Sequence, residues 1–360
     1  MTAGTIEREE TLPPTEFVRA MTLTDATMLV AGSMIGSGIF IVSASIARSV
    51  QSPLWLLLIW ALTGLITLLG ALAYGELAAM FPRAGGQYVF LRESMGPLMG
   101  FLYGWTLFVV IQTGTIAAVA VAFGRFLGVL WPAITPDRYA WFPQADVCIR
   151  ALGCTDVSTT IQLGLTPQRL AGLVTVWMLT WVNLRGVREG KLVQTSLTVV
   201  KTGALALLII LGFAVGHNAT AIAANFGKAF TAGPSYGTAF VLAAGAAMVG
   251  SLFSSDAWNN VTFAAAEVHN PKRNLPLALL LGTGLVSLLY VLCNVSYLQV
   301  LPMNGTADGA TVLARGIAHA TQDRVATAAT EQMFGAGGAT AMAIAILIST
   351  FGCNNGLILA

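Results

Sequence analysis

A glycine-studded interruption lies inside the first long apolar segment of this chain. It reads Gly32-Ser33-Met34-Ile35-Gly36-Ser37-Gly38-Ile39-Phe40. If Gly36, Ser37 and Gly38 let a helix unwind, the N–H groups that open its second half have no helical acceptor. Such a helix N-terminus, with free donors and a partial positive charge, is suited to a carboxylate. The alternative is close packing of two helices through Gly32 and Gly36, because small residues four apart favour helix contacts in membranes.

A second interruption falls in the sixth apolar segment. It reads Phe253-Ser254-Ser255-Asp256-Ala257-Trp258-Asn259-Asn260. A carboxylate at the centre of a membrane helix costs about 2.5 to 3.5 kcal/mol, so we expect Asp256 to be paired or to face a cavity. Carbonyl oxygens that end the first half of this helix would carry a partial negative charge suited to an ammonium group. The alternative is a structural polar contact between helices. One break for a carboxylate and one for an ammonium describe a site for an α-amino acid.

Lys201 is a third candidate, well inside the fifth apolar segment. It lies about ten residues, or roughly 15 Å of helix rise, beyond Lys191. Its long side chain could reach the membrane surface. Otherwise the ammonium is buried and must pair with carbonyls or a carboxylate, or lose its proton. A fixed cation near the first break could replace a coupling sodium ion, or it could carry a proton.

The composition identifies the class of protein that positions these groups. Hydrophobic residues make up 56% of the chain and charged residues 9%, whereas soluble domains carry about a quarter charged residues. We therefore expect a polytopic, all-α membrane protein. The net charge of +2 is spread thinly and gives no reason to expect a nucleic-acid partner. Residues 1–20 are polar and lack the features of a signal peptide, which predicts a short cytosolic tail and an uncleaved first helix.

Eight stretches reach the length of about twenty apolar residues that a spanning helix requires. They are 23–49, 53–81, 96–131, 168–186, 190–216, 236–266, 275–301 and 337–360. The two breaks fall in the first and the sixth of these stretches. An inverted five-helix repeat, as found in many transporters, would place two such breaks in these positions.

Two polar loops are predicted, one between the third and fourth segments and one over about 302–336. The first loop contains Cys148 and Cys154, which either close a small disulfide or are free. Cys293 and Cys353 lie in apolar runs, where a cysteine packs as a small hydrophobic residue. The three histidines are far apart, so no metal site is expected. No nucleophile–base pair or nucleotide motif is present either, and we predict neither an enzyme nor a cofactor.

Basic residues near the ends of short loops set the orientation of membrane helices. The dense clusters are Arg185 to Lys191 and Lys272-Arg273, and they predict a cytosolic amino terminus. The opposite side then receives Arg48, Arg125, Arg138, Arg150, Arg169, Lys228, Arg315 and Arg324.

From about Met21 to Ala360 the sequence resembles the amino acid–polyamine–organocation (APC) superfamily, most closely its L-type amino-acid transporter branch. The matching motifs are Gly32–Phe40, Tyr74–Leu77, Phe81–Tyr88, Gly100–Trp105 and Glu267–Pro276. The resemblance implies a LeuT-type fold of two inverted five-helix repeats with two further helices. Residues 21–216 would form the first repeat and 217–360 an incomplete second one. Since the chain ends in an apolar run, we expect a fragment truncated within the eighth transmembrane helix.

The resemblance also implies roles for individual residues. The backbone of Gly36, Ser37 and Gly38 would hold the substrate carboxylate, and the carbonyls of Met34, Phe253, Ser254 and Asp256 the ammonium. Phe253 would also be an aromatic gate, with Trp258 and Asn259 supporting the second break. The positions implied to face the substrate side chain are Val110, Ile111 and Thr115. Lys201 matches the lysine that fills the sodium position in sodium-independent members. The chain departs from the family at Ser255, where an aromatic residue is common, at Ala257, where glycine is common, and at Ala266, often acidic.

The resulting prediction is an amino-acid permease of the plasma or inner membrane that works as a sodium-independent exchanger or a proton symporter. Its partners would be an amino acid, as the small-molecule substrate, and the lipid bilayer, and the sequence does not identify a partner subunit. One alternative is a polyamine or other organocation permease, which the carboxylate of Asp256 favours. Two others are a sensor that binds an amino acid without transporting it, and a truncated, non-functional copy.

Overall fold

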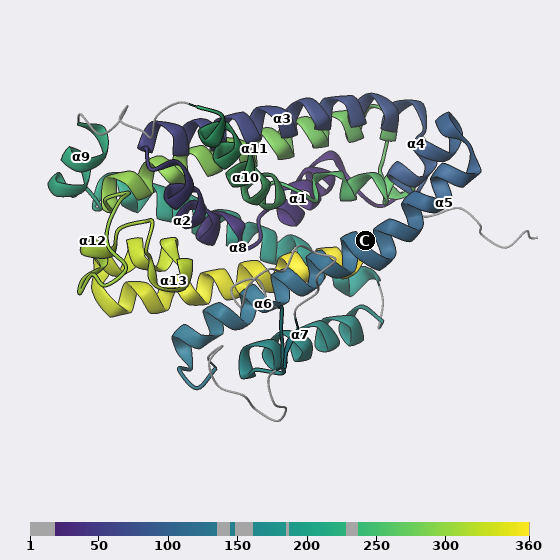
Figure 1. The fold of residues 1–360 in the computed structure, drawn as a ribbon. Coiled ribbons are helices and arrows are strands. Elements are labelled where there is room, and N and C mark those ends of the chain that lie inside the picture. Colours follow the sequence, from purple (N-terminus) through teal and green to yellow (C-terminus); the bar gives the residue numbers. More distant parts are fainter. Residues whose placement is uncertain (1–18, 135–144, 148–160, 185–186, 228–236, 360) are drawn as a thin grey trace, which may run out of the picture.

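The computed structural model describes residues 19–134, 145–147, 161–184, 187–227 and 237–359 (Figure 1). Cys148 and Cys154 lie outside the described residues, as does most of the predicted tail. The helices are α1 (Leu23–Met34), α2 (Gly38–Val50), α3 (Pro53–Met80), α4 (Gly86–Met95), α5 (Pro97–Thr106), the π-helix η1 (Leu107–Gln112), α6 (Thr113–Leu130), α7 (Pro167–Asn183), α8 (Val187–Ala214), α9 (Ala219–Phe226), α10 (Thr238–Ser254), the 3₁₀-helices η4 (Trp258–Thr262) and η5 (Ala265–Glu267), α11 (Pro271–Val300), α12 (Val312–Arg315), the 3₁₀-helix η6 (Thr321–Asp323) and α13 (Val325–Leu359). Two short strands, β1 (Ala145–Val147) and β2 (Ile161–Leu163), pair antiparallel.

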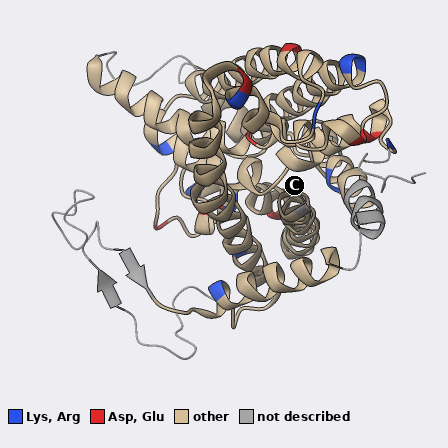
Figure 2. Ribbon diagram, turned by 90° about the vertical axis from the view of Figure 1, so that its right-hand side faces the viewer, with Lys and Arg blue, Asp and Glu red and all other residues tan. Residues whose placement is uncertain are grey.

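The all-α polytopic architecture is confirmed. Six stretches of helix among the described residues are long and apolar enough to span a membrane, and the bent pair α1–α2, if counted as one span, brings the number to seven. The predicted fourth span corresponds to α7, which has 17 residues and is shorter than the about twenty that the hydrocarbon core requires. The helical ribbon carries few charged residues (Figure 2).

Long antiparallel helices form the core of the bundle. α3 and α11 run side by side, and α13 packs against α6 and α8 (Figure 1). Glycines allow these close approaches: a Cβ atom at Gly64 would lie 2.9 Å from Cβ of Ser287, and one at Gly75 would lie 3.1 Å from Cα of Pro276. Small residues at contact points are the usual basis of helix packing in membranes.

Two glycines of α11 give a matched test of this packing. A Cβ atom at Gly282 would lie 2.6 Å from Cγ1 of Val30, whereas a Cβ atom at Gly284 would have no atom within 4 Å. We expect Gly282→Ala to lower the free energy of unfolding by about 1–3 kcal/mol, the usual cost of overpacking, and Gly284→Ala to leave it unchanged. Thermal unfolding in detergent, followed by tryptophan fluorescence, measures both. Equal unfolding temperatures for the two variants would contradict this account of the α1–α11 contact.

The predicted polar loop over about 302–336 is wrong in its second half. Helix α13 begins at Val325, and the backbone kinks at Gly335, where φ is 66° and ψ is −157°. Thr327, Thr330 and Glu331 interrupt the apolar pattern, and for this reason the sequence predicts a loop here. The alanines, Glu331 and Gln332 of the same stretch have high helix propensity, and the stretch forms a helix when one of its faces is buried.

The amino-terminal end of α1 is joined to the end of η5 by backbone groups. The N–H groups of Ala20 and Met21 donate to the carbonyl of Glu267, each at 2.9 Å, and the N–H of His269 donates to the carbonyl of Met21 at 2.9 Å. Met21 and Val268 thereby form an isolated parallel bridge. The start of the first broken helix is thus tied to the end of the second.

Four arginines that the sequence assigns to one side of the membrane gather at one end of the bundle. Arg48 pairs with Asp323 at 2.7 Å, and Arg125 donates to the carbonyl of Gln322 at 3.4 Å. Arg324 donates to the carbonyl of Arg125 at 3.4 Å, and Arg315 ends α12 nearby. α12 lies at this end, and α4 lies at the opposite end (Figure 1).

Candidate functional site

The first predicted break is confirmed. α1 ends at Met34, α2 begins at Gly38, and the two helices meet at an angle of 43°. Within the described part of the chain, the N–H groups of Gly36, Ser37 and Gly38 donate to no acceptor. These donors open α2, so they carry the partial positive charge of a helix N-terminus. The backbone here can receive an anionic group.

The carbonyl groups of the same break are occupied. Gly32 accepts from Nζ of Lys201, and Ser33 accepts from Sγ of Cys353 at 3.4 Å. The carbonyl of Met34 accepts from the hydroxyl of Tyr290 at 3.0 Å, while Ser349 donates to the carbonyls of Ile35 and Gly36 at 3.3 and 3.0 Å. Side chains from α8, α11 and α13 thus hold the carbonyl side of the break and leave its N–H side free.

The second predicted break is also confirmed. α10 ends at Ser254, and Ala257 has φ 68°, a left-handed conformation that precedes the 3₁₀-helix η4. The carbonyls of Ser255 and Asp256 accept no hydrogen bond from the other described residues, and that of Ser254 accepts only from Tyr290, at 3.2 Å. Free carbonyls at a helix C-terminus carry a partial negative charge. This end of α10 can receive a cationic group.

The two breaks touch each other. A Cβ atom at Gly38 would lie 2.1 Å from Oγ and 2.9 Å from Cα of Ser254, so only glycine fits there. A small cavity lies beside this contact. Eight of the predicted substrate-site residues line it: Met34, Gly36, Ser37, Gly38, Thr115, Phe253, Ser254 and Asp256. Ser33, Val119, Ala257, Cys353 and Leu357 complete the lining.

Three predicted site residues lie elsewhere. Val110 and Ile111 are on the π-helix η1, with 61% and 41% of their surfaces exposed, and neither lines the cavity. Asn259 donates to Oε1 of Gln87 at 3.1 Å. Gln87 also bonds to the hydroxyls of Tyr74 and Tyr103. Asn259 therefore belongs to a polar network that connects η4 with α3, α4 and α5.

Trp258 packs against α3, close to the polar network of Gln87 and Tyr74. Its indole packs edge-on against Tyr74, with ring centroids 4.9 Å apart. A Cβ atom at Gly70 would lie 3.4 Å from this indole, so the ring rests directly on α3. The residues after the left-handed turn at Ala257 are thereby fixed to a long, straight helix.

Lys201 is buried rather than extended to the surface. Only 1% of its surface is exposed, and its ammonium donates to the carbonyl of Gly32 in the last turns of α1. A buried charge needs such a partner. The structure places the side-chain nitrogen of Lys201 about one helical turn before the first break.

Sequence reasoning did not identify Tyr290, Ser349 or Cys353 as site residues. The sequence gives no sign of a site role for Tyr290 or Ser349, and it predicts a packing role for Cys353. All three are isolated in apolar helices, and only the tertiary arrangement brings their polar atoms to the breaks. Tyr290 is the most informative, since its single hydroxyl is shared between Met34 of the first break and Ser254 of the second.

Tyr290→Phe tests this bridge while keeping the ring. The ring packs edge-on against Trp60 at 5.4 Å, and phenylalanine would preserve that contact. We expect the free energy of unfolding to fall by about 1–3 kcal/mol, because two buried carbonyls lose a donor. Tyr297→Phe is the control, since its hydroxyl makes a longer bond of 3.4 Å to the carbonyl of Ile39 and otherwise bonds to the thiol of Cys293 rather than to a second carbonyl. Chemical denaturation in detergent measures both variants, and a larger loss for Tyr297→Phe would contradict the bridge.

The family model described as "Amino acid permease" matches residues 21–360. The b(0,+)-type amino acid transporter 1 of Mus musculus is 29% identical over 290 residues, which cover 81% of this chain and 53% of that protein. The Large neutral amino acids transporter small subunit 2 of Homo sapiens is 30% identical over 339 residues, covering 93% of this chain and 54% of that protein.

A bacterial protein is similar over the same region. The Serine/threonine exchanger SteT of Bacillus subtilis is 27% identical over 337 residues, covering 93% of this chain and 64% of that protein. The chain therefore spans about half to two thirds of the length of these curated relatives.

Proposed function

Because this chain belongs to the amino acid permease family of the APC superfamily, we propose that it carries α-amino acids across a membrane by alternating access. The observation that carries the proposal is the contact of two broken helices at Gly38 and Ser254. Free N–H groups begin α2, and the free carbonyl of Asp256 follows the end of α10, on the walls of one cavity. An α-amino acid carries the two complementary charges on neighbouring atoms.

The proposed substrate contacts follow the charges of the two helix ends. The N–H groups of Gly36, Ser37 and Gly38 bind the carboxylate, as helix N-termini bind anions. The ammonium binds the carbonyls of Phe253 and Ser254 at the end of α10 and of Asp256 just after it, together with that of Met34. Met34 and Ser254 share the hydroxyl of Tyr290, and each carbonyl oxygen has a second lone pair for the substrate. Phe253 and Thr115 line the remaining wall and would contact the substrate side chain.

We further propose that transport does not require sodium. The ammonium of Lys201 bonds to the carbonyl of Gly32 beside the first break and supplies a fixed positive charge where a coupling sodium ion would otherwise be needed. Transport would then proceed by exchange of internal for external substrate, or with a proton. One similar protein bears the name serine/threonine exchanger, which supports exchange as the first expectation.

The proposed topology places the amino terminus in the cytosol and the protein in the cell membrane. The clustering of Arg48, Arg125, Arg315 and Arg324 at one end of the bundle supports a common, outer side for these residues. The repeats proposed for residues 21–216 and 217–360 would place the two breaks in equivalent helices, as inverted repeats do.

Uptake of a radiolabelled amino-acid panel into proteoliposomes tests the function. Vesicles with and without internal amino acid separate an exchanger from a symporter, and an imposed pH gradient identifies proton coupling. Uptake that requires internal substrate and is equal in sodium and choline buffers is the expected result. A polyamine panel runs in parallel, because the exposed carboxylate of Asp256 in the cavity wall favours an organocation permease as second candidate. Uptake of polyamines without uptake of amino acids would overturn the first proposal.

A further inference from the structure

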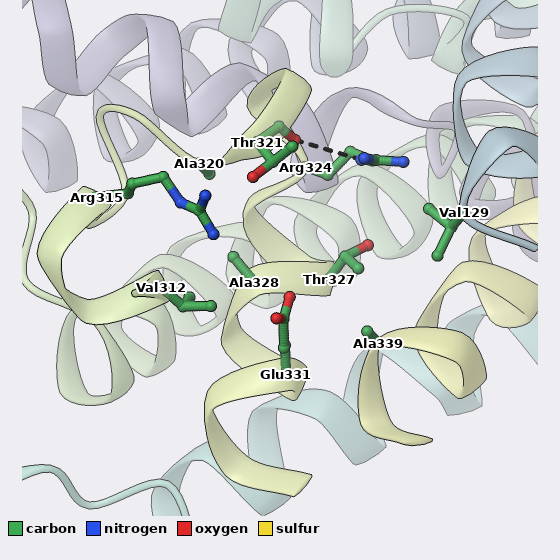
Figure 3. A pocket seen from close by; sticks show the side chains of 10 residues that line it. All are labelled: Val129, Val312, Arg315, Ala320, Thr321, Arg324, Thr327, Ala328, Glu331 and Ala339. Atoms are coloured by element: carbon green, nitrogen blue, oxygen red, sulfur yellow. Dashed lines mark hydrogen bonds between the residues drawn. The ribbon is translucent and has the colours of Figure 1, made fainter. Parts of the chain in front are cut away.

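A second cavity lies at the end of the bundle that holds the four arginines. It measures about 190 Å³, and α12, η6 and the first turns of α13 form most of its wall (Figure 3). It shares no lining residue with the cavity at the two breaks. The proposed transport cycle therefore does not account for its side chains.

Two opposite charges face this cavity outside any ion pair or hydrogen bond between described residues. Arg315 reaches into it from α12, and Glu331 points into it from α13 (Figure 3). Within the described ranges, neither side chain forms an ion pair or a hydrogen bond. A guanidinium and a carboxylate that line one space without pairing leave room for a ligand between them.

A buried hydroxyl in the same wall also lacks a partner. Thr327 is only 6% exposed, and its Oγ1 forms no hydrogen bond with any described residue. Buried polar groups are nearly always hydrogen-bonded to protein or to water, so an orphaned hydroxyl indicates a site for a further polar group. Thr327 lies one turn before Glu331 on α13 and lines the cavity with it.

Arg324 contributes charge rather than a contact. Its guanidinium is turned toward α6 and donates to the carbonyls of Thr321 and Arg125 at 3.3 and 3.4 Å (Figure 3). Burial and the like charge of Arg125 lower the pKa of Arg324, while the carboxylate of Glu331 raises it. The cavity thus has a positive side and a single acidic group.

We propose that this cavity binds the zwitterionic head of an α-amino acid as a second site, with the carboxylate on Arg315 and Thr327 and the ammonium on Glu331. A simple anion would face the carboxylate of Glu331, and a simple cation would face Arg315, so each would be repelled by one group. An uncharged ligand would leave both charges unpaired. The inference rests on the proposed function only in taking an α-amino acid as the ligand.

Protection of an introduced thiol tests the site directly. Val312 is half-buried and lines the cavity, so Val312→Cys would report its occupancy through the rate of reaction with a membrane-impermeant thiol reagent. Cys148 and Cys154 are replaced by serine, and Gly38→Val removes the contribution of the first site. Glycine is the probe because it consists of the zwitterionic head alone. With a dissociation constant of about 1 mM, about 10 mM glycine would slow the reaction about tenfold.

The variants and competitors make each outcome decisive. Acetate and methylammonium, each carrying one of the two charges, are expected to protect less than about twofold at the same concentration. Arg315→Gln and Glu331→Gln should abolish protection by glycine, whereas Asp308→Asn, an exposed carboxylate outside the cavity, should retain it. Size-exclusion profiles and the reaction rate without ligand check that each variant is folded.

Equal protection by acetate, or protection that survives both Arg315→Gln and Glu331→Gln, would overturn the zwitterion site. An unchanged rate with glycine would do the same. The two proposals fail separately: protection without amino-acid uptake by the protein would contradict only the transport function, and uptake without protection would contradict only the second site.

Discussion

Gly38→Val will lower amino-acid uptake by the reconstituted protein by at least about fivefold. A side chain at position 38 meets Ser254 at once, because even its Cβ would lie 2.1 Å from Oγ and 2.9 Å from Cα of that residue. The backbone of α10 cannot yield without moving the carbonyls that we assign to the ammonium. If α2 instead moved away from α10 to remove the clash, the N–H donors assigned to the carboxylate would move away from the cavity. Overpacking costs about 1–3 kcal/mol, which corresponds to a loss of uptake of at least about fivefold to a hundredfold.

Two further variants distinguish a steric cause from a general effect of the larger side chain. Gly245→Val is the control on α10, since a Cβ atom at Gly245 would have no atom within 4 Å. We expect it to transport normally. In the second test, Ser254→Gly is combined with Gly38→Ala, which removes the two closest contacts of the new Cβ. Partial recovery of uptake relative to Gly38→Ala would show coupling between the two positions. Normal uptake by Gly38→Val would contradict the assignment of this contact to the site.

Lys201→Met will lower uptake by about tenfold to a hundredfold, with sodium unable to restore it. The substitution keeps the length of the side chain but removes the charge that bonds to the carbonyl of Gly32. Hydrogen bonds to charged groups contribute about 1.5–3 kcal/mol, and the loss falls on the α1 segment that precedes the free N–H groups. Initial rates in sodium and choline buffers measure the effect, with Thr202→Val as the neighbouring control because its Oγ1 has no partner among the described residues.

The result for Lys201→Met also bears on coupling. Retained exchange with loss of uptake driven by a pH gradient would identify Lys201 as a proton carrier. Loss of both would identify it as the fixed cation that holds the first break. Uptake at the wild-type rate in both assays would contradict either role and would leave the buried ammonium with only a structural function.

The breaks were predictable from sequence because polar and small residues interrupt otherwise apolar runs. Gly36 to Gly38 and Ser254 to Asp256 mark the unwound positions to within about one residue. Membrane helices tolerate such residues only where the freed backbone groups face protein or a cavity. The residues that the resemblance added to these breaks, Thr115 among them, bring to eight the predicted site residues that line one cavity.

Partners from distant segments were not predictable. Nothing in the sequence around Lys201 indicates that its acceptor is Gly32, and an isolated tyrosine at 290 gives no sign of the two carbonyls it contacts. The resemblance assigned Val110, Ile111 and Thr115 to the substrate side chain, but Val110 and Ile111 lie in the π-helix η1 and only Thr115, after it, lines the cavity. The start of α13 was missed because Thr327 and Glu331 serve a polar cavity rather than a loop.

The bridge between Met21 and Val268 consists only of main-chain groups. It therefore tolerates most amino-acid substitutions at these positions. Any residue other than proline supplies the same N–H and C=O, so an alanine scan of positions 21, 267 and 269 would not detect it. Only proline at position 20, 21 or 269 would delete a donor. The side chains at the start of α1 and the end of η5 can therefore change during evolution while the two segments stay hydrogen-bonded. We expect little sequence covariation between the two segments.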